Sequence, residues 1–434
     1  MSHGKRAVGL TGAISIGIGG MVGGGIFAVL GEAVSMAHGA TAISFFVAGI
    51  VALLTSIAYA RLSVKYRNRG GTVVFIDTAF GNNLISGSLN LMLWLSYLVT
   101  IALYAVAFAS YAQTFFPGNT SVLLKHVLIS IAILLPTTIN LVSASFVSKS
   151  ETIIVAIKLI LLIVIIFFSA PYLNPERIAP AHWGSMVSIV ASGMVIFVAF
   201  EGFELIANAA EDMTNPTRNL PIAFFSSVLL VIVLYVLIAL VTLSTVPENE
   251  LLITKDYALA TAAKPALGQT GFVMVSIAAL LATFSAINAT IYGNARLGFV
   301  LAKDGQLPET FDKQVWNEPV MGVVITAFIS LLIANTIDLT EIAIVGSAGF
   351  LLIFALVNAS AFKLKKDIGG NQWVYFVALL LCVTALITLL VHTYQRNVMA
   401  ILVFLSFIGI SILFEVIYGM KLRGHFLGRR YDNV

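Results

Sequence analysis

Charged side chains are scarce in this chain of 434 residues. Only 10% of them are Asp, Glu, Lys or Arg, while 59% are hydrophobic. Soluble domains carry about 25% charged residues, so a water-exposed surface of ordinary size cannot be built from this composition. The scarcity of charge excludes a soluble globular protein and predicts one embedded in a lipid bilayer.

Cysteine and histidine are also rare. The one cysteine, Cys382, lies in an apolar run and cannot form a disulfide within the chain. The six histidines lie near the ends of apolar runs without an i, i+4 pair, so the pattern of a metal site is missing. Neither a Ser-His-Asp order nor a P-loop is visible. We therefore expect no metal, no cofactor and no enzymatic activity.

The sequence contains twelve apolar runs instead, each near the ~20 residues that cross a hydrocarbon core of ~30 Å. Their approximate bounds are 8–36, 40–60, 86–116, 121–141, 152–170, 186–210, 221–246, 270–300, 320–337, 341–362, 373–393 and 398–420. We predict an all-α integral membrane protein of about twelve transmembrane helices. Residues 1–434 would form a single transmembrane domain.

The basic residues are distributed unevenly between the two sides of the expected bundle. Of the 24 Lys and Arg residues, eighteen occupy one set of alternate loops and five the other, while Lys158 lies inside a run. By the positive-inside rule, both termini lie in the cytoplasm of a multi-pass cell-membrane protein. This alternation also argues against nucleic acid as the partner of a chain with net charge +4.

The first run is rich in glycine, with six glycines between positions 17 and 25. Each glycine costs up to ~1 kcal/mol in a helix interior, so we expect this span to be broken. Close packing of helices through small residues is the alternative reading. The sixth run carries Glu201 and Glu204 around Gly202. Acids at such depth usually mark a pathway, although they can also tie helices together.

Interrupted spans 1 and 6 cross the bilayer in opposite directions, because they are five spans apart. This is the signature of two inverted five-helix repeats, with a binding site at the midplane where the broken helices meet. The first repeat would cover about residues 8–170 and the second about 186–362. Helices 11 and 12, at about 373–420, would lie outside the repeat.

Broken helices offer backbone groups to a ligand. The half-helix that starts near Gly23 to Ile26 presents free N–H groups that suit a carboxylate. Half-helices that end near Gly19 to Gly20 and near Phe200 present carbonyls that suit an ammonium. An α-amino acid carries both groups. The predicted substrate-binding residues are Gly19, Met21, Val22, Gly23, Gly24, Gly25, Phe200, Glu201 and Gly202. Phe200 either closes over the substrate or packs.

Five segments of the chain resemble the amino acid–polyamine–organocation (APC) superfamily of transporters. They are Gly17 to Phe27; Arg69-Gly70-Gly71 with Ala79-Phe80-Gly81; Phe200 to Glu204; Glu211-Asp212 with Asn215 to Pro221; and Asn294-Ala295-Arg296 with Ala302 to Pro308. The resemblance covers most of the chain. It implies an inverted 5+5 core, as in sodium-coupled neurotransmitter transporters, and transport of amino acids across the cell membrane by alternating access.

Lys158 is the most informative single residue, because it is a lysine deep inside an apolar run. It lies eight residues beyond Ser150, or ~12 Å into a half-bilayer of ~15 Å. Burial disfavours the charged form of a lysine, so its proton can leave near neutral pH. The resemblance is closest to proton-coupled members of the superfamily. It implies that the Lys158 ammonium occupies the sodium position of sodium-coupled relatives, with Gly19 and Ser285 as partners. A snorkelling or salt-bridged lysine is the alternative.

These observations together predict a proton-coupled symporter for amino acids of broad, mainly neutral specificity. Its partners would be the amino acid, protons and the bilayer, with the proton as coupling ion. An amino acid exchanger of the same fold is the alternative. A channel is disfavoured, because one chain with two inverted breaks does not supply a symmetric pore.

Overall fold

The structure is a computed structural model that describes residues 8–68, 70–116, 118, 121–142, 144–312 and 320–423. Within these residues the chain folds into α-helices and short 3-10 helices, without a strand. Both chain termini and Arg69 lie outside the described residues. The predicted cytoplasmic location of the termini therefore stays a prediction.

Ten helical stretches are long and apolar enough to cross a bilayer. They are α3 (Thr41–Lys65), α5 (Leu84–Gln113), α6 (Val122–Val142), α7 (Ala144–Ser169), the continuous stretch of α8 (Met186–Val195), η4 (Ile196–Glu204) and α9 (Leu205–Asn208), α10 (Pro216–Thr245), α13 (Lys264–Lys303), α15 (Leu339–Lys363), α17 (Gln372–Arg396) and α18 (Val398–Arg423). The stretch from α8 to α9 corresponds to the sixth predicted run and is called the sixth crossing. The bent pair α1 (Leu10–Met21) and α2 (Gly25–Ala37) adds an eleventh crossing. The shorter apolar helix α14 (Val320–Thr336) occupies the ninth predicted run.

All twelve predicted runs are helical, and the prediction of an all-α multi-pass membrane protein is confirmed. Short helices join the spans. In the described residues these are α4 (Thr72–Phe80), η1 (Ala170–Tyr172), η2 (Pro175–Ile178), η3 (Pro180–His182), η5 (Ala210–Asp212), α11 (Glu248–Ile253), η6 (Lys255–Tyr257), α12 (Ala258–Ala262), η7 (Glu309–Asp312) and α16 (Lys365–Ile368). The division into two inverted repeats stays a prediction.

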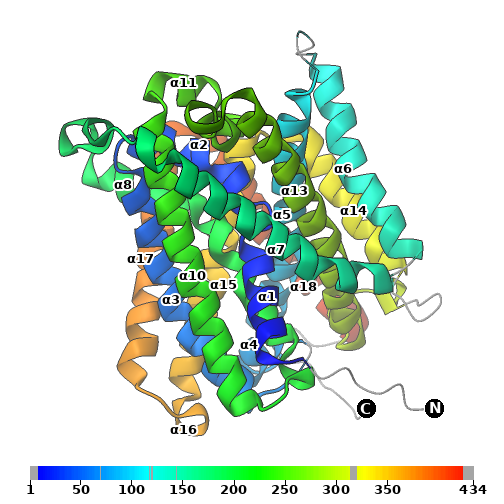
Figure 1. The fold of residues 1–434 in the computed structure, drawn as a ribbon. Helices are drawn as coiled ribbons and strands as arrows, with labels where there is room; N and C mark the ends of the chain where they lie inside the picture. Colours follow the sequence, from blue (N-terminus) through cyan, green and yellow to red (C-terminus); the bar gives the residue numbers. More distant parts are fainter. Residues whose placement is uncertain are drawn as a thin grey trace.

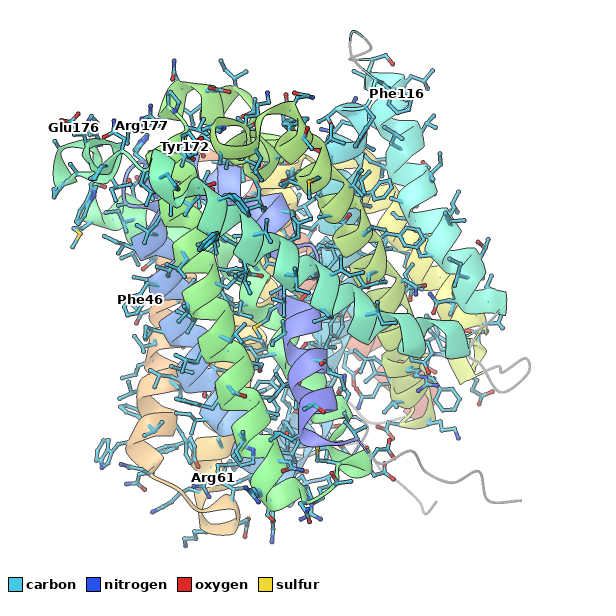
Figure 2. All side chains as sticks on the ribbon, in the orientation of Figure 1. Phe46, Arg61, Phe116, Tyr172, Glu176 and Arg177 are labelled. Carbon is cyan, nitrogen blue, oxygen red and sulfur yellow. The ribbon has the colours of Figure 1, made fainter. Side chains whose placement is uncertain are left out.

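The bundle has two polar ends and an apolar flank. Figure 1 shows α11 at one end and α16 at the other, with the long helices running between them. In Figure 2, Arg61 lies at the α16 end, Glu176 and Arg177 lie at the α11 end, and Phe46 lies on the flank between them. The Phe46 side chain is 51% exposed, as suits a residue that faces lipid. We call the α16 end the basic face and the α11 end the opposite face.

At the opposite face, α2 is tied to the connection between α10 and α13. Glu32 of α2, only 4% exposed, accepts hydrogen bonds from Lys255 Nζ at 2.9 Å and from the Thr340 hydroxyl at 2.7 Å. Burial disfavours the charged form of Lys255, but the Glu32 carboxylate outweighs burial and holds the pKa of Lys255 above its usual value. The outer end of α2 is thereby fixed to η6 and to α15.

Gly31 lets α2 approach η6 at backbone distance, and its replacement by Ala is expected to destabilise the protein. A Cβ at Gly31 would lie 2.1 Å from the Lys255 carbonyl oxygen, so the backbone must shift. Such overpacking costs about 1–3 kcal/mol. Apparent melting temperatures in detergent should fall for Gly31→Ala. They should be unchanged or higher for the control Gly293→Ala in α13, where a Cβ meets nothing within 4 Å. Equal melting temperatures for the two variants would contradict this packing.

Candidate functional site

The first transmembrane crossing is interrupted at Val22, Gly23 and Gly24. There α1 ends at Met21 and α2 begins at Gly25, with a bend of 44° between the two helices. The α-helix therefore runs past Gly19 and Gly20, where we expected it to end. Three neighbours approach the interruption closely. A Cβ would lie 2.7 Å from Ala286 Cβ at Gly23, 2.2 Å from the Tyr104 ring at Gly24 and 2.7 Å from Ala199 Cα at Gly25.

The second interruption has a different form from the one predicted. The α-helix of the sixth crossing ends at Val195 rather than near Phe200, and the nine residues of η4 continue it as a 3-10 helix. A 3-10 helix keeps the backbone hydrogen-bonded, which an unwound segment in a bilayer would not. Ser347 of α15 caps the junction, since its hydroxyl donates to the Val195 carbonyl at 2.6 Å and accepts from the Val198 N–H at 2.9 Å.

The 3-10 geometry sorts the side chains of η4 onto three faces, because residues i and i+3 eclipse each other at three residues per turn. The three faces are a small face of Ile196, Ala199 and Gly202; an aromatic face of Phe197, Phe200 and Phe203; and an acid face of Val198, Glu201 and Glu204. All nine residues are buried. Each face therefore meets a different part of the protein.

The small face meets the first interruption. A Cβ on Gly202 would lie 2.2 Å from the Gly20 carbonyl carbon, so the two backbones touch. Tyr235 of α10 joins the same two segments, because its hydroxyl lies 2.6 Å from the Met21 carbonyl oxygen and 3.3 Å from that of Ala199. Gly202 of η4 thus packs on the last turn of α1, and Ala199 packs on Gly25 at the start of α2, so η4 lies against both sides of the first interruption.

The aromatic face packs into the core formed by α3, α10 and α15. The Phe200 ring contacts the Tyr235 ring edge-on at 5.1 Å, and Phe203 contacts Phe354 at 5.2 Å and Tyr59 at 5.4 Å between ring centroids. In this structure Phe200 is fully buried by packing.

The acid face lies against α5. The Glu204 carboxylate accepts hydrogen bonds from the hydroxyls of Tyr59 and Thr72, both at 2.9 Å, and from Tyr97 of α5. Three hydroxyl donors on one carboxylate satisfy it without a positive charge. Glu204 therefore joins η4 to α3, α4 and α5, which is what the structural alternative for this residue predicted.

Lys158 reaches the last turn of α1, just before the first interruption, from α7. Its side chain is 2% exposed, and its ammonium donates to the Gly19 carbonyl at 3.2 Å. Ser285 is buried on α13, next to Ala286, which packs on Gly23. All three predicted members of the coupling site are thus buried, and Lys158 and Gly19 are in direct contact. Their role in coupling stays a prediction.

All predicted binding residues gather in the buried centre of the bundle, but sequence reasoning missed their neighbours. Tyr235, Tyr104 and Ser347 contact the interruptions from three other helices. The spacing of Tyr97, Thr100 and Tyr104 at i, i+3 and i+7 marks one face of α5 and could have revealed it. Among the described residues, no group of three His, Cys, Asp or Glu side chains comes together as a metal site would require.

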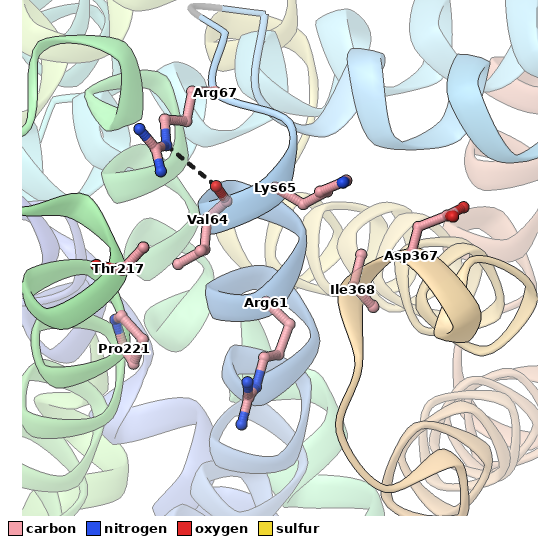
Figure 3. A pocket seen from close by; sticks show the side chains of 8 residues that line it. All are labelled: Arg61, Val64, Lys65, Arg67, Thr217, Pro221, Asp367 and Ile368. Atoms are coloured by element: carbon pink, nitrogen blue, oxygen red, sulfur yellow. Dashed lines mark hydrogen bonds between the residues drawn. The ribbon is translucent and has the colours of Figure 1, made fainter.

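Cavity size does not locate this site. A cavity of about 550 Å³ opens at the basic face between α3, α10 and α16, with Arg61, Lys65 and Arg67 around it (Figure 3). Another, of about 520 Å³, lies at the opposite face beside Lys125 and Asp256. Neither is lined by a residue of an interruption. The candidate site is identified by its backbone geometry and its buried ionisable groups.

A buried pair of interrupted membrane-spanning helices, with ionisable groups held against them, is the architecture of a secondary transporter. The amino acid permease family model matches residues 8–418, nearly the whole described chain. The chain belongs to this family of the APC superfamily and is a membrane transporter rather than an enzyme.

Similar proteins occur in archaea and bacteria. The chain is 34% identical to uncharacterized protein MJ0609 of Methanocaldococcus jannaschii and 32% identical to the inner membrane transport protein YbaT of Escherichia coli, with 96% of this chain and 97% of each relative covered. It is 25% identical to the methylthioribose transporter of Bacillus subtilis, over 94% of this chain and 92% of that protein.

Removal of one of the three hydroxyls that donate to Glu204 tests the role of the acid face. Tyr97→Phe leaves a buried carboxylate one donor short, which costs about 1–3 kcal/mol. The apparent melting temperature in detergent should therefore fall. Tyr394→Phe on α17 is the matched control, because Tyr394 is 67% exposed and its hydroxyl can be replaced without such a cost. A Tyr97→Phe variant as stable as this control would exclude a structural role for the hydrogen bond.

Proposed function

We propose that this protein is a proton-coupled symporter of amino acids with broad, mainly neutral specificity, working by alternating access in the cell membrane. Membership of the amino acid permease family supports amino acids as the substrate class. The contact between Lys158 and the first interruption is the observation that carries proton coupling.

Substrate recognition would take place at the backbone of the two interruptions. The first turn of α2 directs N–H groups toward Gly24, where a carboxylate would gain from them and from the helix dipole. Carbonyls of α1 and of the α8–η4 junction would face the ammonium. The Tyr235 hydroxyl, which contacts the Met21 and Ala199 carbonyls, stands where such a ligand would bind and would make room for it.

Coupling would work through the ammonium of Lys158. A proton drives a conformational change only if the two conformations hold it with different affinity. Contact with the Gly19 carbonyl favours the protonated lysine. Separation of α1 from α7 would remove that acceptor, and the lysine in an apolar setting would then release its proton. Gly19 and Ser285 would be the partners in the protonated state.

An amino acid exchanger of the same fold is the second candidate. In an exchanger, the carrier would change between its two conformations only while an amino acid is bound to the same site. Uptake into empty liposomes separates the two, since an exchanger needs internal amino acid whereas a symporter does not. The basic face, rich in Arg and Lys, would be cytoplasmic together with both termini.

Transport is expected to proceed without sodium. A lysine ammonium near the position of a coupling sodium ion repels a second cation at short range. Uptake of labelled alanine into liposomes should be equal with sodium and with choline at fixed pH. A requirement for sodium at every pH would rule out Lys158 as the coupling cation.

Substitution of Lys158 should uncouple transport from the proton gradient. Lys158→Ala removes the titratable group, and Lys158→Arg leaves one that stays protonated. Both variants should fold, and both should lose accumulation of alanine driven by an inward proton gradient, by at least about ten-fold. Lys303→Ala, at the end of α13, is the control and should accumulate alanine normally.

The pH dependence of uptake gives the decisive readout. Lys158→Ala should retain equilibrium binding of alanine, but the pH profile of its uptake should become flat. If Lys158→Ala and Lys158→Arg both accumulate alanine with the normal profile, Lys158 is a structural lysine and Glu201 or Glu204 carries the proton.

A further inference from the structure

The two carboxyl groups on the acid face of η4 have very different surroundings. Glu204 accepts three hydroxyl hydrogen bonds. Glu201, one turn earlier on the same face, lies beside the Thr100 hydroxyl of α5 and is 3% exposed. Its Oε2 atom is buried without a hydrogen-bond partner among the described residues. One acid is therefore satisfied by the protein, and the other keeps an acceptor to be filled.

A buried acceptor without a donor is unfavourable anywhere and more so at the depth of a membrane span, where bulk water is absent. Native proteins keep few such groups, and one that lies at a functional site points to a role for it. The Tyr97 hydroxyl of α5 already donates to Glu204. The unfilled oxygen of Glu201 therefore calls for a donor that is not part of the fold.

The position of Glu201 indicates what that donor belongs to. Glu201 precedes Gly202, which touches Gly20 at the first interruption. Tyr104, one turn after Thr100 on the same face of α5, covers Gly24 just before the start of α2. A solute held by the backbone of both interruptions would therefore have Glu201 and α5 beside it.

We propose that Glu201 is a specificity-determining residue that accepts a hydrogen bond from the side chain of the bound amino acid. The proposal rests on the proposed function and names the substrate class within it. The preferred substrates are amino acids whose side chain carries an O–H or N–H donor, such as threonine, asparagine and glutamine, over apolar isosteres. A site built to hydrogen-bond a substrate group discriminates strongly against an analogue that lacks it, because the buried acceptor is then left unfilled.

Competition between isosteric amino acids against uptake of labelled alanine tests this proposal. Threonine and valine have nearly the same shape, as do asparagine and leucine. In the wild type, the polar member of each pair should inhibit at least about ten-fold more strongly. In Glu201→Met, of similar length but without an acceptor, the ratio should fall to about one or below. Glu201→Gln keeps a carbonyl acceptor and should retain most of the preference.

The control replaces another buried acid. Glu415 on α18 is 5% exposed, and Glu415→Met should keep the wild-type ratios. If Glu201→Met does not fold, Glu201→Ala takes its place, because it also lacks an acceptor and its ratio should likewise fall to about one or below. Ratios near one in the wild type overturn the proposal, and so does a preference that persists in Glu201→Met.

The outcome also separates this proposal from the proposed function. If no amino acid is taken up and none raises the melting temperature, amino acid transport itself is wrong, and the specificity proposal falls with it. If alanine is transported but threonine and valine compete equally, only the role of Glu201 is wrong. A pH profile of alanine uptake that flattens in Glu201→Met, without any change in these ratios, would make Glu201 a proton carrier and overturn the proposal.

Discussion

Backbone groups inside a bilayer must find their hydrogen-bond partners within the protein, and this constraint governs the centre of the structure. Two crossings depart from the α-helix, and side chains from other helices serve the carbonyls nearby. Lys158 of α7 donates a hydrogen bond to the Gly19 carbonyl. Tyr235 of α10 donates to the carbonyls of Met21 and Ala199, and Ser347 of α15 donates to that of Val195. Three helices are thereby held against the interruptions by directional bonds.

The 3-10 form of η4 turns a short sequence into three distinct surfaces. With three residues per turn, small, aromatic and acidic residues that alternate along the chain separate onto different sides. The small side lets two backbones meet at Gly20 and Gly202, the aromatic side anchors η4 in the core, and the acidic side faces the hydroxyls of α5. A regular α-helix, at 3.6 residues per turn, would have spread these residues around its circumference.

The contacts of η4 with its neighbours also differ in how easily they could break. Glycine backbones at Gly20 and Gly202 touch without interlocking side chains, whereas the Phe203 cluster and the Glu204 hydrogen bonds hold η4 to the rest of the bundle. Under the proposed mechanism, the first crossing would move against a sixth crossing that stays anchored. The Glu32–Lys255 pair, at the opposite face, fixes the outer end of α2 in the arrangement seen here.

Apolar runs, the glycines from Gly17 to Gly25 and the buried acids were enough to predict an all-α membrane protein and to single out the two crossings that depart from the α-helix. The length of an apolar run and its glycine content act locally, so both can be recognised in the sequence. The 3-10 form of η4, the three hydroxyls on Glu204 and the unfilled oxygen of Glu201 could not be predicted in this way. They depend on which side chains of α3, α4, α5 and α15 lie opposite each turn of η4, and the packing of distant helices, unlike hydrophobicity, is set only when the whole bundle has formed.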